Sequence, residues 1–389
     1  MKTPVVQIVH YSDLHIVGPD FYKQRRAFNA IAKRLLPASL QQGISGASIG
    51  ALGAFVDFLR VMEAEPDWHG KPLWLVDTGD GTTFGDSKSL ESWLRDWSPQ
   101  FLNAAGPNAK QLILYGNHDA WPDTFPLLAP RAMGHQRNKL RNMWFTDSWP
   151  MPPLTASLGR GSSFEVQLFA LNSVDHDLLP NTRACGRVLP DRAGLAHAQT
   201  GPTAADDLHR AVAAASKASP GPHFRILAMH YPVAEAAQTG YRATEILSNR
   251  DTFARELITP SFTNQPLAHL LLAGHTHQAY PPIGLMPGAL SSAWQPPLHH
   301  GFAQSVTPSL SQKLVGGTNG AGSYYPEECA RCFPYQCTLH RIYADATPTG
   351  TEVTVERTLV GRPSGGAFGF LPISEGSSRF SEEMVMALA

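Results

Sequence analysis

The chain has few charged residues and no excess of either sign. Asp, Glu, Lys and Arg make up 16% of its 389 residues, against roughly 25% in an average globular protein. Lys and Arg number 31 and Asp and Glu 32, so the formal net charge is −1. A general nucleic-acid binder carries a basic excess, and this balance argues against that function. A small anionic substrate stays open, because a local metal site holds phosphate without a global charge.

Cysteine and long hydrophobic runs are also scarce. Four cysteines in a chain of this length do not suggest the disulfide framework of a small secreted protein. The first residues, Met1 to Pro4, lead straight into an apolar segment, which does not fit a secretory signal. The least polar stretch, about 43–56, is broken by serine and is shorter than the ~20 apolar residues that span a bilayer. We therefore expect a cytoplasmic protein with no membrane segment.

The length implies more than one simple compact core. Single cores stop growing near ~250–300 residues, so 389 residues predict either two domains or one large domain with long insertions. Hydrophobic residues make up 43% of the chain, and Gly and Pro number 33 and 32. These values predict a folded, loop-rich protein with a sizeable core.

Five short apolar runs each end in polar residues, which is typical of buried parallel strands that feed functional loops. The runs cover 5–9, 73–76, 112–115, 224–229 and 270–273. Helical spacing predicts a helix around Phe55 to Met62 and another over 205–217, and Asn249 is placed to cap a third. Alternation then predicts antiparallel strands at 312–315, 336–343 and 352–359. The pattern is that of an α/β fold.

The polar residues at the strand ends carry the chemistry. They are Asp13, His15, Asp80, Asn117, His118, His230, His275 and His277. Imidazole and carboxylate suit zinc, iron and manganese, and this set exceeds what one tetrahedral ion needs. Two ions that share a bridging carboxylate fit the number better. Because alternate residues of an extended segment share a face, we expect His275 and His277 to point into one cleft, and the same for Asp13 and His15.

Each of these elements by itself has a simpler structural explanation. A histidine at a strand end is usually hydrogen-bonded rather than a ligand, and a Gly-Asp pair such as Gly79-Asp80 is usually a turn. Five such elements in order at strand ends are much harder to obtain by chance. The combination therefore indicates a metal site.

The series Asp13-x-His15, Gly79-Asp80, Gly116-Asn117-His118-Asp119, His230 and Gly274-His275-x-His277 resembles the calcineurin-like metallophosphoesterase family. The resemblance implies a four-layer αββα sandwich of two mixed sheets flanked by helices. It also implies two divalent transition-metal ions, manganese, iron or zinc. The domain would cover 1–361, followed by a C-terminal tail at 362–389. Insertions, which we place around the mouth of the site, are expected at 17–48, 121–160, 173–203 and 281–311.

The same resemblance implies a role for each motif residue. The first ion would be held by Asp13, His15 and His277, the second by Asn117, His230 and His275, and Asp80 would bridge them. His118 would lie over the scissile group as a catalytic residue, with Asp119 placed to orient it. A metal-bound hydroxide would attack phosphorus while His118 assists the leaving group. No covalent intermediate is required.

The second motif departs from the pattern of many family members. It reads Gly79-Asp80-Gly81-Thr82-Thr83-Phe84-Gly85-Asp86, so the further carboxylate is displaced and no arginine follows closely. This weakens the likeness to protein Ser/Thr phosphatases, and a missing histidine weakens the likeness to DNA-repair nucleases. The small-molecule and cyclic-nucleotide phosphodiesterases are the closer resemblance. We expect a phosphodiesterase for a small phosphorylated substrate; a phosphomonoesterase on the same metals and a non-catalytic scaffold remain alternatives.

Four further residues have a spacing that superficially suggests zinc: Cys329, Cys332, Cys337 and His340. The segment around Cys337 and His340 reads as a strand, however, and residues three apart on a strand face opposite sides. We therefore do not expect them to share an ion.

Three more polar residues lie close to the motifs. His10 and Asp77 fall inside the predicted strands, out of phase with the ligands, and are expected to be ordinary strand residues. Tyr231 follows a predicted ligand and is a candidate for the substrate pocket.

Overall fold

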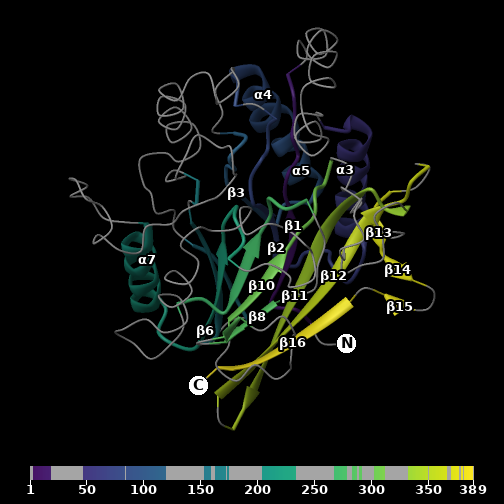
Figure 1. Cartoon of the computed structure of the whole chain (residues 1–389). Coiled ribbons are helices and arrows are strands. Elements are labelled where there is room, and N and C mark those ends of the chain that lie inside the picture. Colours follow the sequence, from purple (N-terminus) through teal and green to yellow (C-terminus); the bar gives the residue numbers. More distant parts are fainter. Residues whose placement is uncertain are drawn as a thin grey trace, which may run out of the picture.

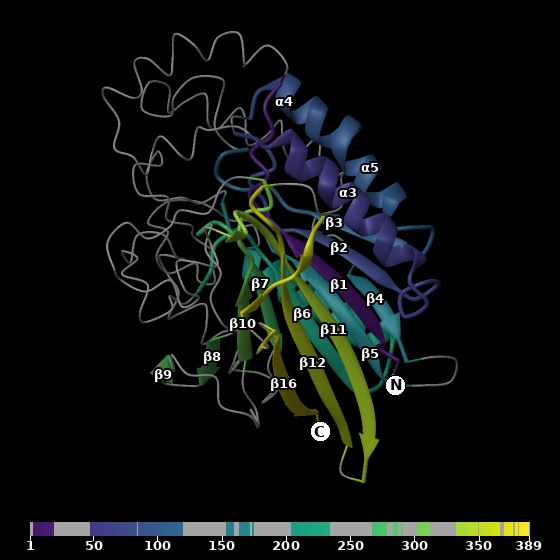
Figure 2. The same ribbon diagram turned by 90° about the vertical axis from the view of Figure 1, so that its right-hand side faces the viewer.

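The structure is a computed structural model, and it describes the greater part of the chain. The described residues are 3–18, 47–83, 85–119, 153–158, 163–171, 173–174, 204–233, 267–277, 283–286, 289–290, 302–311, 332–348, 350–365, 369–375, 378–379 and 381–388. Two mixed sheets of seven strands each form the framework (Figures 1 and 2). The expected pair of mixed sheets is therefore confirmed.

The first sheet has a parallel centre and a long antiparallel side. Its strand order is β13-β12-β11-β1-β2-β3, and β16 also pairs with β12. Strands β1, β2 and β3 are parallel, whereas β11 is antiparallel to both β1 and β12. The strands are β1 Val6–Tyr11, β2 Leu73–Asp77, β3 Ala109–Ile113, β11 Tyr335–Thr347, β12 Gly350–Arg362, β13 Leu371–Pro372 and β16 Ser381–Leu388.

The second sheet has the order β4-β5-β6-β7-β10-β8-β9. Its four central strands, β5, β6, β7 and β10, are parallel. The strands are β4 Leu154–Ser157, β5 Glu165–Ala170, β6 His223–Ala228, β7 Leu270–Ala273, β10 Phe302–Val306, β8 Ile283–Met286 and β9 Ala289–Leu290. A separate two-stranded ribbon joins β14 Ser374–Glu375 to β15 Ser378–Arg379.

Few helices are described, and they cover the outer faces of the sheets. On the first sheet these are α3 Ile49–Ala64, α4 Ser87–Glu91, the π-helical turn η1 Ser92–Trp97 and α5 Ser98–Ala104; on the second it is α7 Ala204–Ala218. Figure 2 shows α3 and α5 along the outer side of the first sheet. No helix in the described ranges combines the length and apolarity needed to cross a bilayer.

Alternating residues of the strands explain this layering. Ile8 of β1 and Ile226 of β6 belong to one buried cluster between the sheets. Phe55 of α3 belongs to a second cluster with β1, and Leu208 of α7 to a third with β6 and β7. Each central strand therefore buries both faces, which explains its continuous apolar sequence.

The predicted elements hold where they fall on described residues. All five apolar runs are strands, although the third covers Ala109–Ile113 and not 112–115. The helices around Phe55 and over 205–217 are α3 and α7. The strands at 336–343 and 352–359 are parts of β11 and β12. The helix after Asn249 and the strand at 312–315 lie outside the described residues.

Segments expected to be insertions or a tail contribute strands to both sheets. Strand β4 lies within 121–160, and β8, β9 and β10 lie within 281–311. In the expected tail, β16 pairs with β12 over eight residues. Strand β10 escaped the sequence analysis because its buried positions include Gln304 and Ser305, whose polarity masks a buried strand. The rest of the expected insertions lies largely outside the described residues.

Candidate metal centre

Two groups of potential metal ligands meet at the carboxyl ends of the central strands. In the first, Asp13, His15, Asp80 and His277 offer ligand atoms that all lie within 4.8 Å of one another. In the second, Asp80, His230 and His275 meet the same limit. Asp80 belongs to both groups. The loops that follow β1, β2, β6 and β7 supply these residues, so the two sheets build the centre together.

The atoms of the two groups approach one another closely. In the first group, Nε2 of His277 lies 3.1 Å from Nε2 of His15 and 3.1 Å from Oδ1 of Asp13. In the second, Nε2 of His230 lies 3.1 Å from Nδ1 of His275 and 3.5 Å from Oδ2 of Asp80.

Asn117, from the loop after β3, joins the second group. Its Oδ1 lies 2.9 Å from Nε2 of His230. The structure thus brings together all seven predicted ligand residues, in the two sets that the family resemblance implied.

The backbone of this centre is unusual. Five non-glycine residues in the described ranges have positive φ, and all five are predicted ligands: Asp13 (56°), His15 (49°), Asp80 (53°), His275 (72°) and His277 (54°). The left-handed conformation costs an ordinary residue roughly 1–2 kcal/mol, and such strain is concentrated at functional sites. The ligands therefore do not converge through the alternation of an extended strand, as the sequence suggested. They converge because each loop turns sharply beyond its strand.

Hydrogen bonds between the loops hold this strained geometry. The amides of Asp13 and His15 donate to the carbonyls of Gly79 and Asp80, both at 2.9 Å. The amide of His275 donates to Oδ2 of Asp13 at 3.0 Å, and the amide of His118 to Oδ1 of Asp80 at 2.8 Å. Each carboxylate thus has one oxygen fixed by the backbone of another loop.

Glycine is required where these loops cross. A Cβ on Gly116 would lie 2.1 Å from Oδ1 of Asp80, and one on Gly274 would lie 1.9 Å from Oγ of Ser12. Both clashes involve tightly held atoms, so no small shift relieves them. The glycines of the third and fifth motifs are therefore explained by close packing of the loops.

Gly116→Ala is expected to displace the Asp80 carboxylate and weaken metal binding in both groups, because Asp80 is common to them. The loss of metal affinity should reach at least the ~10–100-fold typical of disturbed ligand orientation. Metal content per chain after dialysis tests this. Gly53→Ala is the matched control, because a Cβ there meets nothing within 4 Å. Unchanged metal content in Gly116→Ala would contradict the geometry.

The pKa values of the predicted ligands favour the binding of a cation. Burial, followed by the neighbouring His230, lowers the pKa of His275 to about 3. Burial by itself would raise the pKa of Asp13, but His277 outweighs it and lowers the pKa to about 2. Burial would lower the pKa of His230, but the Asp80 carboxylate outweighs it and raises the pKa to about 9. The carboxylates are therefore ionised, and a cation would displace the proton of His230.

The donor set fits divalent transition metals. Nitrogen and oxygen atoms converge from buried residues and from the half-buried His275 and His277, and no thiolate is among them. His230 has the typical support of a metal-bound histidine, because its Nδ1–H donates to the carbonyl of Thr78 at 2.8 Å and leaves Nε2 facing the centre. Asp13, His15 and His277 would hold one ion and Asn117, His230 and His275 the other, with Asp80 shared.

His118 lies beside the first group without belonging to either. Its ring centroid is 4.6 Å from that of His15, edge to face. Its Nδ1 lies 3.0 Å from the carbonyl of Thr83, so Nδ1 carries the proton of that hydrogen bond. Burial lowers the pKa of His118, against an opposing effect of Asp80.

Asp119 forms hydrogen bonds with the loops around His118. Its carboxylate accepts hydrogen bonds from the amides of Gly81, Thr82 and Gly116 and from the Thr82 hydroxyl, at 2.7–3.2 Å. Burial, and then the charge of Asp80, raise the pKa of Asp119 to about 7. The positioning contact at Nδ1 of His118 therefore comes from Thr83, which the sequence analysis missed. The Thr82-Thr83 pair, two residues after Asp80, was the sequence feature that could have indicated this contact.

Other residues singled out in the sequence have structural roles. His10 is buried in β1 with Nε2 3.1 Å from Oγ1 of Thr78, and Asp77 accepts from the amide of Gly79 at 2.9 Å. Tyr231 is fully buried against the rings of His230 and His275. Its ring therefore packs against two predicted ligands, and its buried side chain does not line an open substrate pocket.

Cys337 and His340 face opposite sides of the first sheet, as predicted. Cys337 belongs to the cluster beneath α3, whereas Nε2 of His340 contacts Oγ of Ser305 in the second sheet at 3.0 Å. These two residues do not share a metal ion. Cys329 lies outside the described residues.

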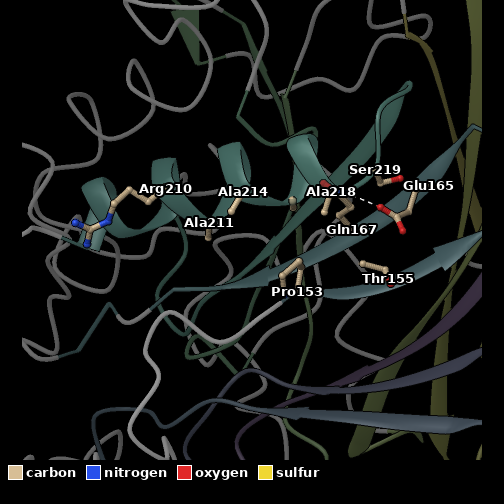
Figure 3. Close-up of a pocket in the computed structure, with 10 residues that line it drawn as sticks. Pro153, Thr155, Glu165, Gln167, Arg210, Ala211, Ala214, Ala218 and Ser219 are labelled. Atoms are coloured by element: carbon tan, nitrogen blue, oxygen red, sulfur yellow. Dashed lines mark hydrogen bonds between the residues drawn. The ribbon is translucent and has the colours of Figure 1, made fainter.

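A separate hollow of about 620 Å³ lies between α7 and strands β4 and β5 (Figure 3). Alanines of α7 form one wall, and Glu165 and Gln167 of β5 contribute to the other, joined by a hydrogen bond of 2.8 Å. None of the described residues that line it is a predicted ligand. The hollow is therefore not part of the metal centre.

Comparison with known families agrees with this geometry. A family model described as calcineurin-like phosphoesterase matches residues 6–279, which include every predicted ligand. The chain belongs to the calcineurin-like phosphoesterases, a family of metal-dependent hydrolases. No curated protein matches the chain.

Proposed function

We propose that this metallophosphoesterase uses two metal ions to hydrolyse a phosphodiester in a small molecule, of the kind represented by cyclic nucleotides. The observation that carries the proposal is the pair of buried ligand groups that share Asp80. Two adjacent divalent ions are the arrangement with which many phosphoesterases hold both the attacking and the leaving oxygen. Bound there, manganese, iron or zinc ions neutralise phosphate charge and lower the pKa of a water molecule towards neutrality.

The protein's own residues then have three tasks. Asp13, His15 and His277 would hold the metal ion of the first group. The shared Asp80 would keep the ions of the two groups at a constant separation. His118 is proposed to protonate the leaving oxygen. Thr83 supports this role because its carbonyl accepts from Nδ1–H of His118. The proton for the leaving oxygen would then come from Nε2–H of the protonated ring, a form that the Asp80 carboxylate favours against the effect of burial. General acid assistance of this kind typically contributes ~10²–10⁴-fold to the rate.

The charge of the described part of the centre supports the proposal of a diester over a monoester. A phosphodiester carries one negative charge, whereas a monoester approaches two at neutral pH. Among the described residues, the groups that most strongly shift the pKa values of Asp13, Asp80 and His230 are other Asp and His side chains, not Lys or Arg. A monoester dianion would benefit from such additional cations, and a diester needs fewer of them.

The cellular setting is proposed to be the cytoplasm. Cys332 and Cys337 are free thiols, the former exposed and the latter buried. Free thiols are typical of a reducing compartment. The near-neutral charge further supports a small phosphorylated substrate over a nucleic acid.

A parallel assay of three substrate classes tests the proposal. Metal-stripped protein is reloaded with Mn²⁺, Zn²⁺ or Fe²⁺ and given bis(p-nitrophenyl) phosphate, p-nitrophenyl phosphate or a cyclic nucleotide. We expect kcat/KM for at least one diester to exceed that for the monoester by ~10-fold or more, a difference of ~1.4 kcal/mol in transition-state binding. A preference for the monoester would replace the proposal with a phosphomonoesterase. A protein that binds metal and hydrolyses neither would be a scaffold.

A further inference from the structure

The segment that follows β10 contacts the end of β1 and the loop that carries Asp13 through three hydroxyl groups at alternate positions. Thr307 Oγ1 donates to the carbonyl of His10 at 3.0 Å, and Ser309 Oγ donates to the carbonyl of Asp13 at 2.7 Å. Ser311 Oγ donates to the carbonyl of Leu14. Ser309 and Ser311 thus reach the loop after β1, and Thr307 reaches the end of β1 itself. We call these three residues the hydroxyl strap.

The strap is buried and is anchored by backbone bonds on both sides. All three hydroxyl residues are at most 1% exposed. Ser309 forms an isolated parallel bridge with Ser12, and the amide of Leu310 donates to the carbonyl of Ser12 at 3.1 Å. The amide of Thr307 donates to the carbonyl of Ala273 at 2.9 Å, just before the loop that carries His275 and His277. The strap is therefore tied by its backbone to the loop after β1 on one side and to the end of β7 on the other.

The strap completes the hydrogen bonding of a strained loop. The carbonyls of Ser12, Asp13 and Leu14 all accept from the strap segment, and the carbonyl of His15 accepts from Thr83 Oγ1 at 2.8 Å. The left-handed conformation of Asp13 and His15 takes this loop out of regular strand pairing, so its carbonyls need donors from other segments. A buried carbonyl that loses its donor is costly. The hydroxyls thus favour the conformation that Asp13 and His15 need.

His230 of the second group and His15 of the first differ in how their rings are supported. Nδ1 of His230, in the second group, donates to a backbone carbonyl. Nδ1 of His15, in the first group, is buried and has no hydrogen-bond partner within the part of the chain that the structure describes. A metal-bound histidine usually depends on such a bond for its orientation. The position of His15 therefore depends on its backbone.

We propose that the hydroxyl strap sets the geometry of the first ligand group and thereby its affinity for a cation, with Ser309 as the principal positioning residue. This inference rests on the proposed function, because it takes Asp13 and His15 as metal ligands. Each strap hydroxyl donates a hydrogen bond to a carbonyl within residues 10–14. Loss of a strap hydroxyl should therefore weaken the first group selectively and leave the second group nearly unchanged.

Two backgrounds separate the groups. His275→Ala removes a ligand of the second group only, and His277→Ala removes a ligand of the first group only. Full-length protein is stripped of metal with a chelator, and Mn²⁺ binding is measured by titration calorimetry with and without Ser309→Ala. We expect Ser309→Ala to weaken Mn²⁺ binding ~10–100-fold in the His275→Ala background. In the His277→Ala background we expect the affinity for Mn²⁺ to change less than ~3-fold. The remaining ligands there belong to the second group, and the strap hydroxyls donate to carbonyls of residues 10–14 instead.

Controls distinguish positioning from general destabilisation. Ser98→Ala also removes a buried hydroxyl donor, the one that bonds Gln111 at 2.8 Å between α5 and β3. It should lower the thermal unfolding midpoint comparably and leave Mn²⁺ binding unchanged. Ser309→Cys keeps the volume with a poorer donor and should weaken Mn²⁺ binding in the same background.

Three results are informative in different ways. Selective weakening in the His275→Ala background supports the proposal. Equal affinities with and without Ser309→Ala, in protein that binds Mn²⁺, would overturn the role of the strap and leave the proposed function intact. A wild-type protein that takes up no Mn²⁺, Zn²⁺ or Fe²⁺ would overturn both.

Discussion

Asp80→Ala is expected to empty both metal groups in a single step and to reduce hydrolysis to the level of the metal-stripped protein. Asp80 is the only residue that both groups share among those the structure describes. Its Oδ1 is fixed by the amide of His118 at 2.8 Å, and its Oδ2 lies 3.5 Å from Nε2 of His230. Without the Asp80 carboxylate, four histidines, Asn117 and a single carboxylate, that of Asp13, would remain to hold two cations. Elemental analysis should fall from close to two ions per chain to well below one.

Asp77→Asn is the matched control for this prediction. Asp77 lies three residues earlier and is as buried as Asp80. Burial raises the pKa of its carboxyl well above the usual value. Asparagine can still accept the hydrogen bond from the amide of Gly79. Metal content should therefore be retained. A variant Asp80→Ala that keeps both ions would show that the bridging assignment is wrong.

His118→Ala should separate chemistry from metal binding. The contact of His118 with Asp80 is made by its backbone amide, which alanine retains, so metal content should not change. The side chain is expected to protonate the leaving group, and its loss should lower kcat ~10²–10⁴-fold on diesters with a poor leaving group such as an alkoxide. With nitrophenolate, which needs little protonation, the loss should be much smaller.

His275→Ala provides the contrast, because it removes a ligand of the second group and should reduce metal content and activity together. The decisive measurement is the kcat of His118→Ala across a series of leaving groups of rising pKa. If the loss is the same for every leaving group, the general-acid assignment is wrong. If His118→Ala empties a metal group, the residue is a ligand.

Much of this centre could be predicted from the order of residues along the chain. Short apolar runs predicted parallel strands, and parallel strands in one sheet place their carboxyl ends at a common edge. Asp13, Asp80 and Asn117 follow three adjacent strands of the first sheet, and His230 and His275 follow neighbouring strands of the second. The meeting of the two sheets then brings these positions together, as the resemblance to the family implied.

Other features could not be predicted, because their sequences carry no distinctive pattern. Strand β10 is buried yet contains Gln304 and Ser305, so its hydropathy does not indicate a core strand. Strand β16 is recognisable only by its pairing with β12. The hydrogen bond between Nδ1 of His118 and the carbonyl of Thr83, 35 residues earlier, had no signal in the spacing of the motifs.

The sequence by itself determined which side chains stand at the strand ends, and hence the chemistry that the centre can perform, because residue type and strand periodicity are local properties. Only the tertiary structure decided how those side chains converge. The left-handed backbone of Asp13 and His15 is unfavourable locally, and it persists because Thr83, Ser309 and Ser311 satisfy the carbonyls of that loop. Those donors lie some 70 to 300 residues away in the chain, so no local pattern could have revealed them.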